Sequence, residues 1–231
     1  MVKFNIIELE NEISIDEYME KYNDVEKFLG YCEACPNYSK TWSCPPFDFN
    51  VEDFLKEYKN LKIIGKKIEI SESENERGME IQTDISDDKI NRDIENKIGK
   101  IEADKQVGVE NKAKEAKAIE KKYSEDIEIK KEMIKKELEY QKKSVLGELL
   151  ELEKQDPNIR ALSMGRCTEC EICTRQEGKD CRNKDKMRYS IEALGGDVVG
   201  ITQDLLHHEI KWSKGNEIPE YFILVGGLLS K

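Results

Sequence analysis

Long uninterrupted apolar runs are missing from the sequence. Its first residues, Met1-Val2-Lys3-Phe4-Asn5, lead directly into a short amphipathic stretch. A signal peptide has an apolar core of roughly 7–15 residues and a membrane-spanning helix needs about 20, so neither is indicated here. We therefore expect a cytoplasmic protein that has no membrane partner.

A surplus of positive charge is also missing. Lysine and arginine together number 38, against 49 aspartates and glutamates, which gives a formal net charge of -11 at pH 7. Proteins that bind nucleic acids neutralise phosphates with clustered basic residues, so this balance argues against a nucleic-acid partner. The sequence also contains no phosphate-binding glycine loop and no convincing Ser/His/Asp arrangement. Catalytic motifs in the sequence therefore identify neither a catalytic residue nor an enzyme class.

Residues 71–150 contain no proline, phenylalanine, tryptophan or cysteine, and 38 of these 80 residues are charged (21 acidic and 17 basic). This composition cannot build a thick core. We expect residues 71–146 to be an inserted charged helical hairpin or coiled coil with a turn near Gly108; a solvated, partly disordered insertion is the alternative. Such helices would bind a protein partner or pair with a second copy of the chain in a homo-oligomer. Two narrow apolar stripes at helical spacing support the helices: Ile90, Ile94, Ile98 and Ile101, then Ile119, Tyr123, Ile127, Ile134, Leu138, Val145 and Leu149.

The sequence on either side of the insertion is richer in apolar residues. Residues 1–70 and 147–231 each lack enough strands for a sheet, so we expect them to pack as one cysteine-rich metal-binding α+β domain. Its expected fold is a small mixed sheet with flanking helices and cysteine-rich loops. The pattern predicts strands at 4–9, 61–70, 197–201 and 221–225, and helices at 14–22, 50–58 and 189–194.

The seven cysteines carry the strongest functional signal. An odd number of clustered cysteines in a reducing cytosol indicates metal ligation rather than structural disulfides. The second set along the chain is Cys167-x2-Cys170-x2-Cys173-x7-Cys181. Its first three residues match the bacterial-ferredoxin run, in which one loop wraps three corners of a cubane cluster. A zinc knuckle needs only one pair of cysteines separated by two residues, so three evenly spaced cysteines favour an iron-sulfur cluster over zinc.

The first set is Cys32-x2-Cys35-x8-Cys44, and Pro45 follows Cys44 as a proline commonly follows the last ligand of a ferredoxin run. Two complete clusters need eight thiolates, whereas the chain has seven. Three arrangements are open. The second set can hold one cluster while the first binds another metal with an open or non-cysteine position, ligands can cross between the sets, or one cluster can form beside spare thiols.

The identity of the missing eighth ligand decides between two functions, an electron carrier and an enzyme. A three-cysteine cluster with an exchangeable iron is a Lewis-acid site that binds a substrate sulfur or oxygen. His207 and His208 are the only histidines and can supply the eighth ligand; a helix-end or surface position is the other interpretation.

Arginines gather around the second cysteine set. The chain has only seven, yet four lie within 23 residues: Arg166, Arg175, Arg182 and Arg188. Guanidinium groups can neutralise an anionic cluster, hydrogen-bond its sulfurs or hold an anionic ligand beside it. We take Arg166, Arg182 and Arg188 as candidate cofactor-binding residues, with exposed surface arginines as the alternative.

Two longer motifs contain the cysteines: Cys32-Glu-Ala-Cys35-Pro-Asn-Tyr38-Ser-Lys-Thr-Trp42-Ser-Cys44-Pro45-Pro46, and Cys167-x2-Cys170-x2-Cys173 followed by Cys181-Arg182 and Arg188-Tyr189-Ser190-Ile191-Glu192-Ala193-Leu194-Gly195. They resemble the motifs of a family of predicted metal-binding proteins, the domain of unknown function 2284. Lys184 and Tyr189 stand where the family pattern has prolines, which affects loop stiffness and leaves the candidate ligands intact. The resemblance covers residues 1–70 and about 147–231; it implies metal binding and supplies no reaction.

These observations favour an iron-sulfur protein of an anaerobic cytoplasm, with one or two clusters of the 4Fe-4S type. Such a protein passes electrons to a redox partner protein or presents an open iron to a small substrate. One alternative is a zinc-stabilised interaction module, in which the metal joins short loops and the helical insertion binds a partner. The other is a metallochaperone or thiol-redox protein that uses its Cys-x2-Cys pairs to carry metal or exchange disulfides.

Overall fold

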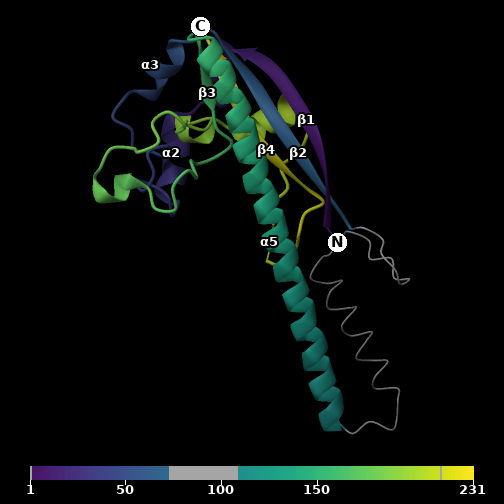
Figure 1. Cartoon of the computed structure of the whole chain (residues 1–231). Helices are drawn as coiled ribbons and strands as arrows, with labels where there is room; N and C mark the ends of the chain where they lie inside the picture. Colours follow the sequence, from purple (N-terminus) through teal and green to yellow (C-terminus); the bar gives the residue numbers. More distant parts are fainter. Residues whose placement is uncertain (1, 73–108, 214) are drawn as a thin grey trace. The chain divides into compact units, whose positions relative to one another are not determined.

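The computed structural model describes residues 2–72, 109–213 and 215–231 (Figure 1). These residues have the α+β architecture that the sequence predicts. Within them, no helix combines the length and the hydropathy that a bilayer crossing requires. The elements are β1 (Val2–Ser14), α1 (Ile15–Tyr22), α2 (Val25–Glu33), α3 (Val51–Lys56), β2 (Asn60–Glu72), α5 (Val109–Gln155), β3 (Ile159–Leu162), the 3-10 turns η1 (Thr174–Glu177) and η2 (Glu192–Leu194), α6 (Val198–Asp204) and β4 (Tyr221–Ser230).

The four strands form one antiparallel sheet in the order β1-β2-β4-β3, so the expectation of a mixed sheet is wrong. Helices α1 to α3 return the chain to the end of the sheet at which β1 finishes, and the Ile15 N–H donates to Lys59 O at 2.7 Å. The other end of β2 lies beside the start of β4, where the Ile70 N–H donates to Glu220 O at 2.8 Å. β3 pairs antiparallel with the end of β4. Neighbouring strands that run in opposite directions can be joined without a crossover connection.

Short polar side chains begin the helices that the sequence predicts near residues 14 and 50. Ser14 Oγ accepts a hydrogen bond from the Glu17 N–H at 3.2 Å, which starts α1. Asn50 Oδ1 accepts from the Asp53 N–H at 3.0 Å, which starts α3. Each side chain satisfies a backbone donor that has no partner within the helix. Both helices are confirmed, although α3 ends at Lys56.

Two predictions near the C-terminal end of the chain are wrong. The helix expected at 189–194 is only the turn η2, which ends at Gly195 with a φ of 78°. Residues 197–201, expected as a strand, begin α6 instead. Asp197 Oδ1 accepts from the Gly200 N–H at 2.9 Å, and Ile201 is fully buried. This cap and the burial of one helix face outweigh the strand preference of the β-branched residues.

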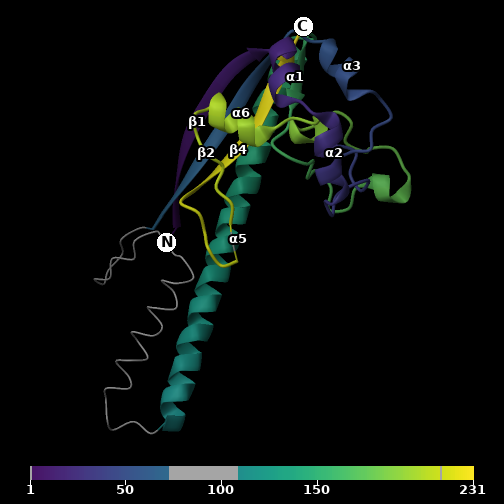
Figure 2. The same ribbon diagram turned by 180° about the vertical axis from the view of Figure 1, so that it is seen from behind.

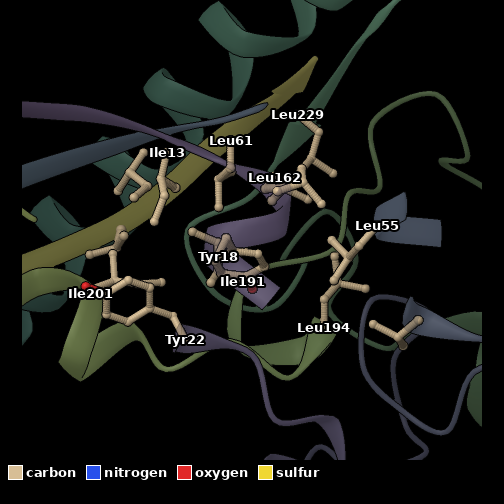
Figure 3. Packing of buried hydrophobic residues seen from close by; sticks show 14 of the residues in the cluster. Ile13, Tyr18, Tyr22, Leu55, Leu61, Leu162, Ile191, Leu194, Ile201 and Leu229 are labelled. Carbon is tan, nitrogen blue, oxygen red and sulfur yellow. The ribbon is translucent and has the colours of Figure 1, made fainter. Parts of the chain in front are cut away.

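The chain divides into two compact units, and the main core belongs to the second. Figure 3 shows how Tyr18 of α1, Leu61 of β2, Ile191 and Leu194 near η2, and Leu229 of β4 gather in it. All five are almost completely buried. The first unit comprises Met1–Asn5, Ile68–Leu138 and Lys211–Phe222, and the second comprises Ile6–Lys67, Glu139–Ile210 and Ile223–Lys231.

Helix α5 contains the second half of the predicted charged insertion. Ile127 and Ile134 of its apolar stripe are buried, and Val145 and Leu149 pack in a second core cluster with Leu228 and its neighbours. The helix therefore buries the stripe that the sequence predicts. It continues without a break across residue 147, where we placed a domain boundary. Residues 73–108, with the first stripe and the expected turn, and the side chains of residues 119 and 123 lie outside the described part of the structure.

Candidate metal centre

All seven cysteines belong to the second unit and are free thiols. Cys32 lies in the last turn of α2, a helix that the sequence did not predict; the Asp24 side chain caps it by accepting from the Lys27 N–H at 2.9 Å. Cys35 and Cys44 follow in the first cysteine loop, defined as residues 34–50. The remaining four lie in the second cysteine loop, residues 163–190. Figure 2 shows α2 beside this second loop.

The four cysteines of the second loop line a single pocket of about 140 Å³: Cys167, Cys170, Cys173 and Cys181. Asn183 Nδ2 donates to Cys170 Sγ at 3.0 Å. Asn37 and Trp42 of the first loop also line the pocket, whereas none of the three cysteines of the first set does. The second set is therefore gathered around one space, as its spacing predicts.

The thiols act on one another electrostatically within each set. Burial raises the pKa of Cys167, and the charges of Glu169, Cys181 and Cys170 add to this increase, against a backbone hydrogen bond that lowers it. Burial also raises the pKa of Cys32, followed by the charges of Cys44, Cys35 and Glu192. Grouped thiols repel each other as thiolates, and a bound metal relieves this repulsion.

Arg175 joins the two cysteine loops. Its Nη1 donates to Thr41 O at 2.8 Å and to Cys44 O, and its Nη2 donates to Pro46 O. The guanidinium also lies over the Trp42 ring, with its central carbon 5.1 Å from the ring centroid. Sequence reasoning counted Arg175 among the clustered arginines but did not select it as a site residue. Its role depends on contacts more than 100 positions apart, for which spacing gives no signal.

Ser43 makes a second connection between the loops. Its hydroxyl is completely buried and accepts from the Cys167 backbone N–H at 2.9 Å. One residue further along, Cys44 belongs to the first set. Trp42 Nε1 donates to Lys179 O at 3.1 Å in the second loop. The two cysteine sets are thus held in one packed body by specific hydrogen bonds.

The three arginines predicted to bind a cofactor have different surroundings. Arg166 is exposed, lines the cysteine pocket and donates to Cys167 O at 3.4 Å. Arg182 is exposed. Arg188 is buried and bound by Glu153 of α5, with Nε–Oε2 and Nη2–Oε1 distances of 2.7 and 2.8 Å. The Arg188 guanidinium therefore already has an anionic partner, and a cofactor-binding role stays a prediction for all three.

Both histidines follow the end of α6. His208 Nδ1 lies 2.7 Å from Leu206 O, just after α6, and neither His207 nor His208 lines the cysteine pocket. In the described part of the chain, no three Cys, His, Asp or Glu side chains come close enough together to hold one metal ion. A cubane is bound at its separate corners, so its ligands surround a space instead of meeting at a point. The cysteine pocket has this arrangement.

The fold and the site together define a cysteine-rich α+β protein whose two thiol-bearing loops are packed against each other. The chain belongs to the family described as "Predicted metal-binding protein (DUF2284)", which matches residues 19–229. Membership in this family supports metal binding in general and does not identify the metal. No curated protein and no solved structure matches the chain.

Proposed function

We propose that this protein carries a 4Fe-4S cluster on Cys167, Cys170, Cys173 and Cys181 and transfers electrons to a redox partner protein. The observation that carries the proposal is the single pocket lined by all four thiols. Four cysteines supply a ligand for each corner of a cubane, which leaves no open iron at this cluster. A fully ligated cluster is typical of electron transfer, whereas chemistry on a substrate needs an exchangeable position.

The surroundings of the pocket are consistent with a tuned redox centre. The Asn183 amide donates to Cys170 Sγ, and hydrogen bonds to ligand sulfurs help to set cluster potentials. Arg166 at the pocket adds a positive charge beside the ligands. Trp42 forms part of the pocket wall. In this proposal the chain's own residues hold and orient the cluster, and the cluster would supply the one-electron chemistry.

The proposal is tested by purifying the full chain without oxygen and measuring iron, sulfide and zinc. We expect iron and sulfide in equal amounts, with visible absorption that zinc, a d¹⁰ ion, lacks. Cys170→Ala should lose most of the iron of the second set. The matched control is Lys122→Ala, an exposed position on α5 that should keep the iron of the wild type.

Two results would contradict the proposal. One is stoichiometric zinc without sulfide in the anaerobic protein, which would favour a zinc-stabilised module. The other is a wild-type iron content in Cys170→Ala.

A further inference from the structure

Positive charge gathers around the cysteine pocket, although the chain as a whole is acidic. The two cysteine loops, residues 34–50 and 163–190, hold eight basic and six acidic residues, whereas the whole chain has 38 and 49. The loops therefore carry a local surplus of positive charge in a protein whose formal net charge is -11. A surface of one sign attracts partners of the opposite sign and raises the rate at which they associate.

Three cations from different segments form this region, which we call the basic surface: Lys40 of the first loop, Arg166 of the second loop and Lys143 of α5. Lys40 and Arg166 line the cysteine pocket. Arg166 and Lys143 line a smaller pocket of about 20 Å³, which shares Cys167 with the cysteine pocket. All three basic residues are exposed. The basic surface thus extends over both loops and the neighbouring helix, beside the four thiols.

The charges of the basic surface are not used up in ion pairs. None of its three cations has a carboxylate partner among the described residues. The neighbouring lysines do: Lys142 pairs with Glu139 at 3.3 Å, and Lys186 pairs with Glu169 at 3.7 Å. Two carboxylates line the cysteine pocket, those of Glu169 and Glu171. Because Glu169 already has a cation, Glu171 alone opposes the three cations of the basic surface.

The basic surface also lies where an electron would leave a cluster on the second set. Cys170 and Cys173 are only partly buried, so such a cluster would approach the protein surface at this pocket. A redox partner has to bring its own centre close to that edge. Charges at the rim of an interface mainly steer the encounter, and small, weak interfaces are typical of electron-transfer complexes.

We infer that the basic surface docks a small acidic electron-carrier protein over the cysteine pocket. This inference rests on the proposed function and names the class of its redox partner. One electron passes between the cluster and the redox centre of the carrier, so that one centre is oxidised as the other is reduced and no bond forms or breaks. The overall negative charge repels an acidic carrier, but at physiological salt the Debye length is about 8 Å and charges near the contact dominate.

The test uses one electron acceptor with two opposite charges. Cytochrome c is basic, and succinylation of its lysines makes it acidic while the haem stays the acceptor. The full chain is purified without oxygen, reduced, and mixed with each form at ionic strengths from about 0.1 to 1 M, over which the Debye length falls from about 10 to 3 Å. The haem absorbance gives the second-order rate constant. Iron, sulfide and zinc are measured first in every sample.

The main variant combines Lys40→Glu with Lys143→Glu and so reverses two of the three charges. The matched control combines Lys122→Glu with Lys135→Glu, which changes the net charge equally at exposed positions of α5 that line neither pocket.

We expect the wild-type rate with the acidic acceptor to fall as salt rises. At low salt the main variant should react more than about tenfold more slowly with the acidic acceptor and faster with the basic one, because rim charges control association rates. At high salt the difference should shrink to within about threefold. The control should behave as the wild type.

Two results would overturn the docking surface alone. One is a wild-type rate with the acidic acceptor that rises with salt, because the overall negative charge would then govern the encounter. The other is a main variant that changes both rates in the same direction and shifts the reduction potential, because the cations would then only tune the cluster. If the main variant loses iron, Lys40→Gln and Lys143→Gln are compared singly in its place. Zinc without iron or sulfide would overturn the proposed function and this inference together, and the metal analysis distinguishes that result from a failed docking surface.

Discussion

The ion pair between Glu153 and Arg188 connects α5 to the end of the second cysteine loop and is the most stringent test of the packing. The two side chains are 14% and 8% exposed and share two hydrogen bonds. Glu153 also accepts from Arg160 Nη1 and from the Ala161 N–H, each at 2.9 Å. Glu153→Ala removes all four contacts and leaves the Arg188 charge buried without an anion.

Removing one partner of a buried ion pair costs about 3–5 kcal/mol. Because Glu153 is not fully enclosed, we expect the lower end, about 3 kcal/mol in the free energy of unfolding. For a chain of this size each kcal/mol shifts the melting temperature by roughly 2–4 °C, so the melting temperature should fall by about 6–12 °C. Glu151→Ala is the matched control: it lies on the same helix and pairs with Lys154, but both side chains are well exposed. Its effect should stay within about 0.5 kcal/mol.

The contribution of Glu153 should also depend on pH. Burial raises its pKa, but the hydrogen bonds from Arg188 and the Ala161 N–H, with the charges of Arg160 and Arg188, lower it below the ordinary value of 4.5. A folded-state pKa below the unfolded one means that the stabilisation is complete above the unfolded pKa. It is lost as the pH falls through the folded pKa. The stability difference between wild type and Glu153→Ala should thus be constant near neutral pH and narrow only in acid.

The assay is urea denaturation followed by far-ultraviolet circular dichroism at several pH values, with iron measured in each sample so that metal loss is not mistaken for lost packing. Equal effects of Glu153→Ala and Glu151→Ala would refute the reasoning. A difference that widens toward acid pH would refute the assigned direction of the pKa shift.

Three further predictions follow from local geometry. Gly196→Ala should lower the free energy of unfolding by about 1–3 kcal/mol, because an added Cβ overlaps the buried core. Gly30→Ala has open space in α2 and should raise the free energy of unfolding by up to about 1 kcal/mol. Urea denaturation checks both predictions, because the two changes should have opposite signs. Ser14→Ala should cost about 1 kcal/mol by removing the cap of α1, and an unchanged urea midpoint would contradict this. Arg175→Ala should release iron to a chelator faster than the exposed control Lys122→Ala on α5, because Arg175 hydrogen-bonds from the second cysteine loop to the first; equal rates would show that Arg175 does not support the site.

Local patterns in the sequence predicted much of the fold and the grouping of the four cysteines of the second set. The Ser14 cap, the Asn50 cap and the apolar stripe of α5 depend on residues three or four positions apart, which the sequence displays directly. The spacing from Cys167 to Cys181 likewise predicted residues that line one pocket. In each case the residues that interact lie within about two helical turns of each other or within one loop.

Long-range contacts were out of reach of the same reasoning. Arg175 and Thr41 are 134 positions apart, and Arg188 and Glu153 are 35 apart. Sequence analysis made Arg188 a candidate cofactor-binding residue because the arginines cluster along the chain, and that clustering gave no indication of its ion pair with Glu153 of α5. Glu192 was quoted only as part of a motif, whereas in the structure it lines one pocket with Cys32, a proximity that neither periodicity nor spacing encodes.

Under the proposed function, we expect the cysteine loops to be the part of the second unit whose structure depends most on a bound metal. The second loop has a single short turn, η1, before η2, and its Cys170 and Cys173 are only partly buried. Between residues 165 and 187 its only buried side chain is Thr174, and hydrogen bonds of Arg175, Ser43 and Trp42 join it to the first loop. A segment with so few buried side chains gains little free energy from burial to offset its loss of chain entropy, so under the proposed function we expect metal–thiolate bonds to supply part of the free energy that orders it. The sheet and its core do not share this dependence, because their stability comes from buried side chains. Loss of metal should therefore loosen the two loops while the sheet stays folded.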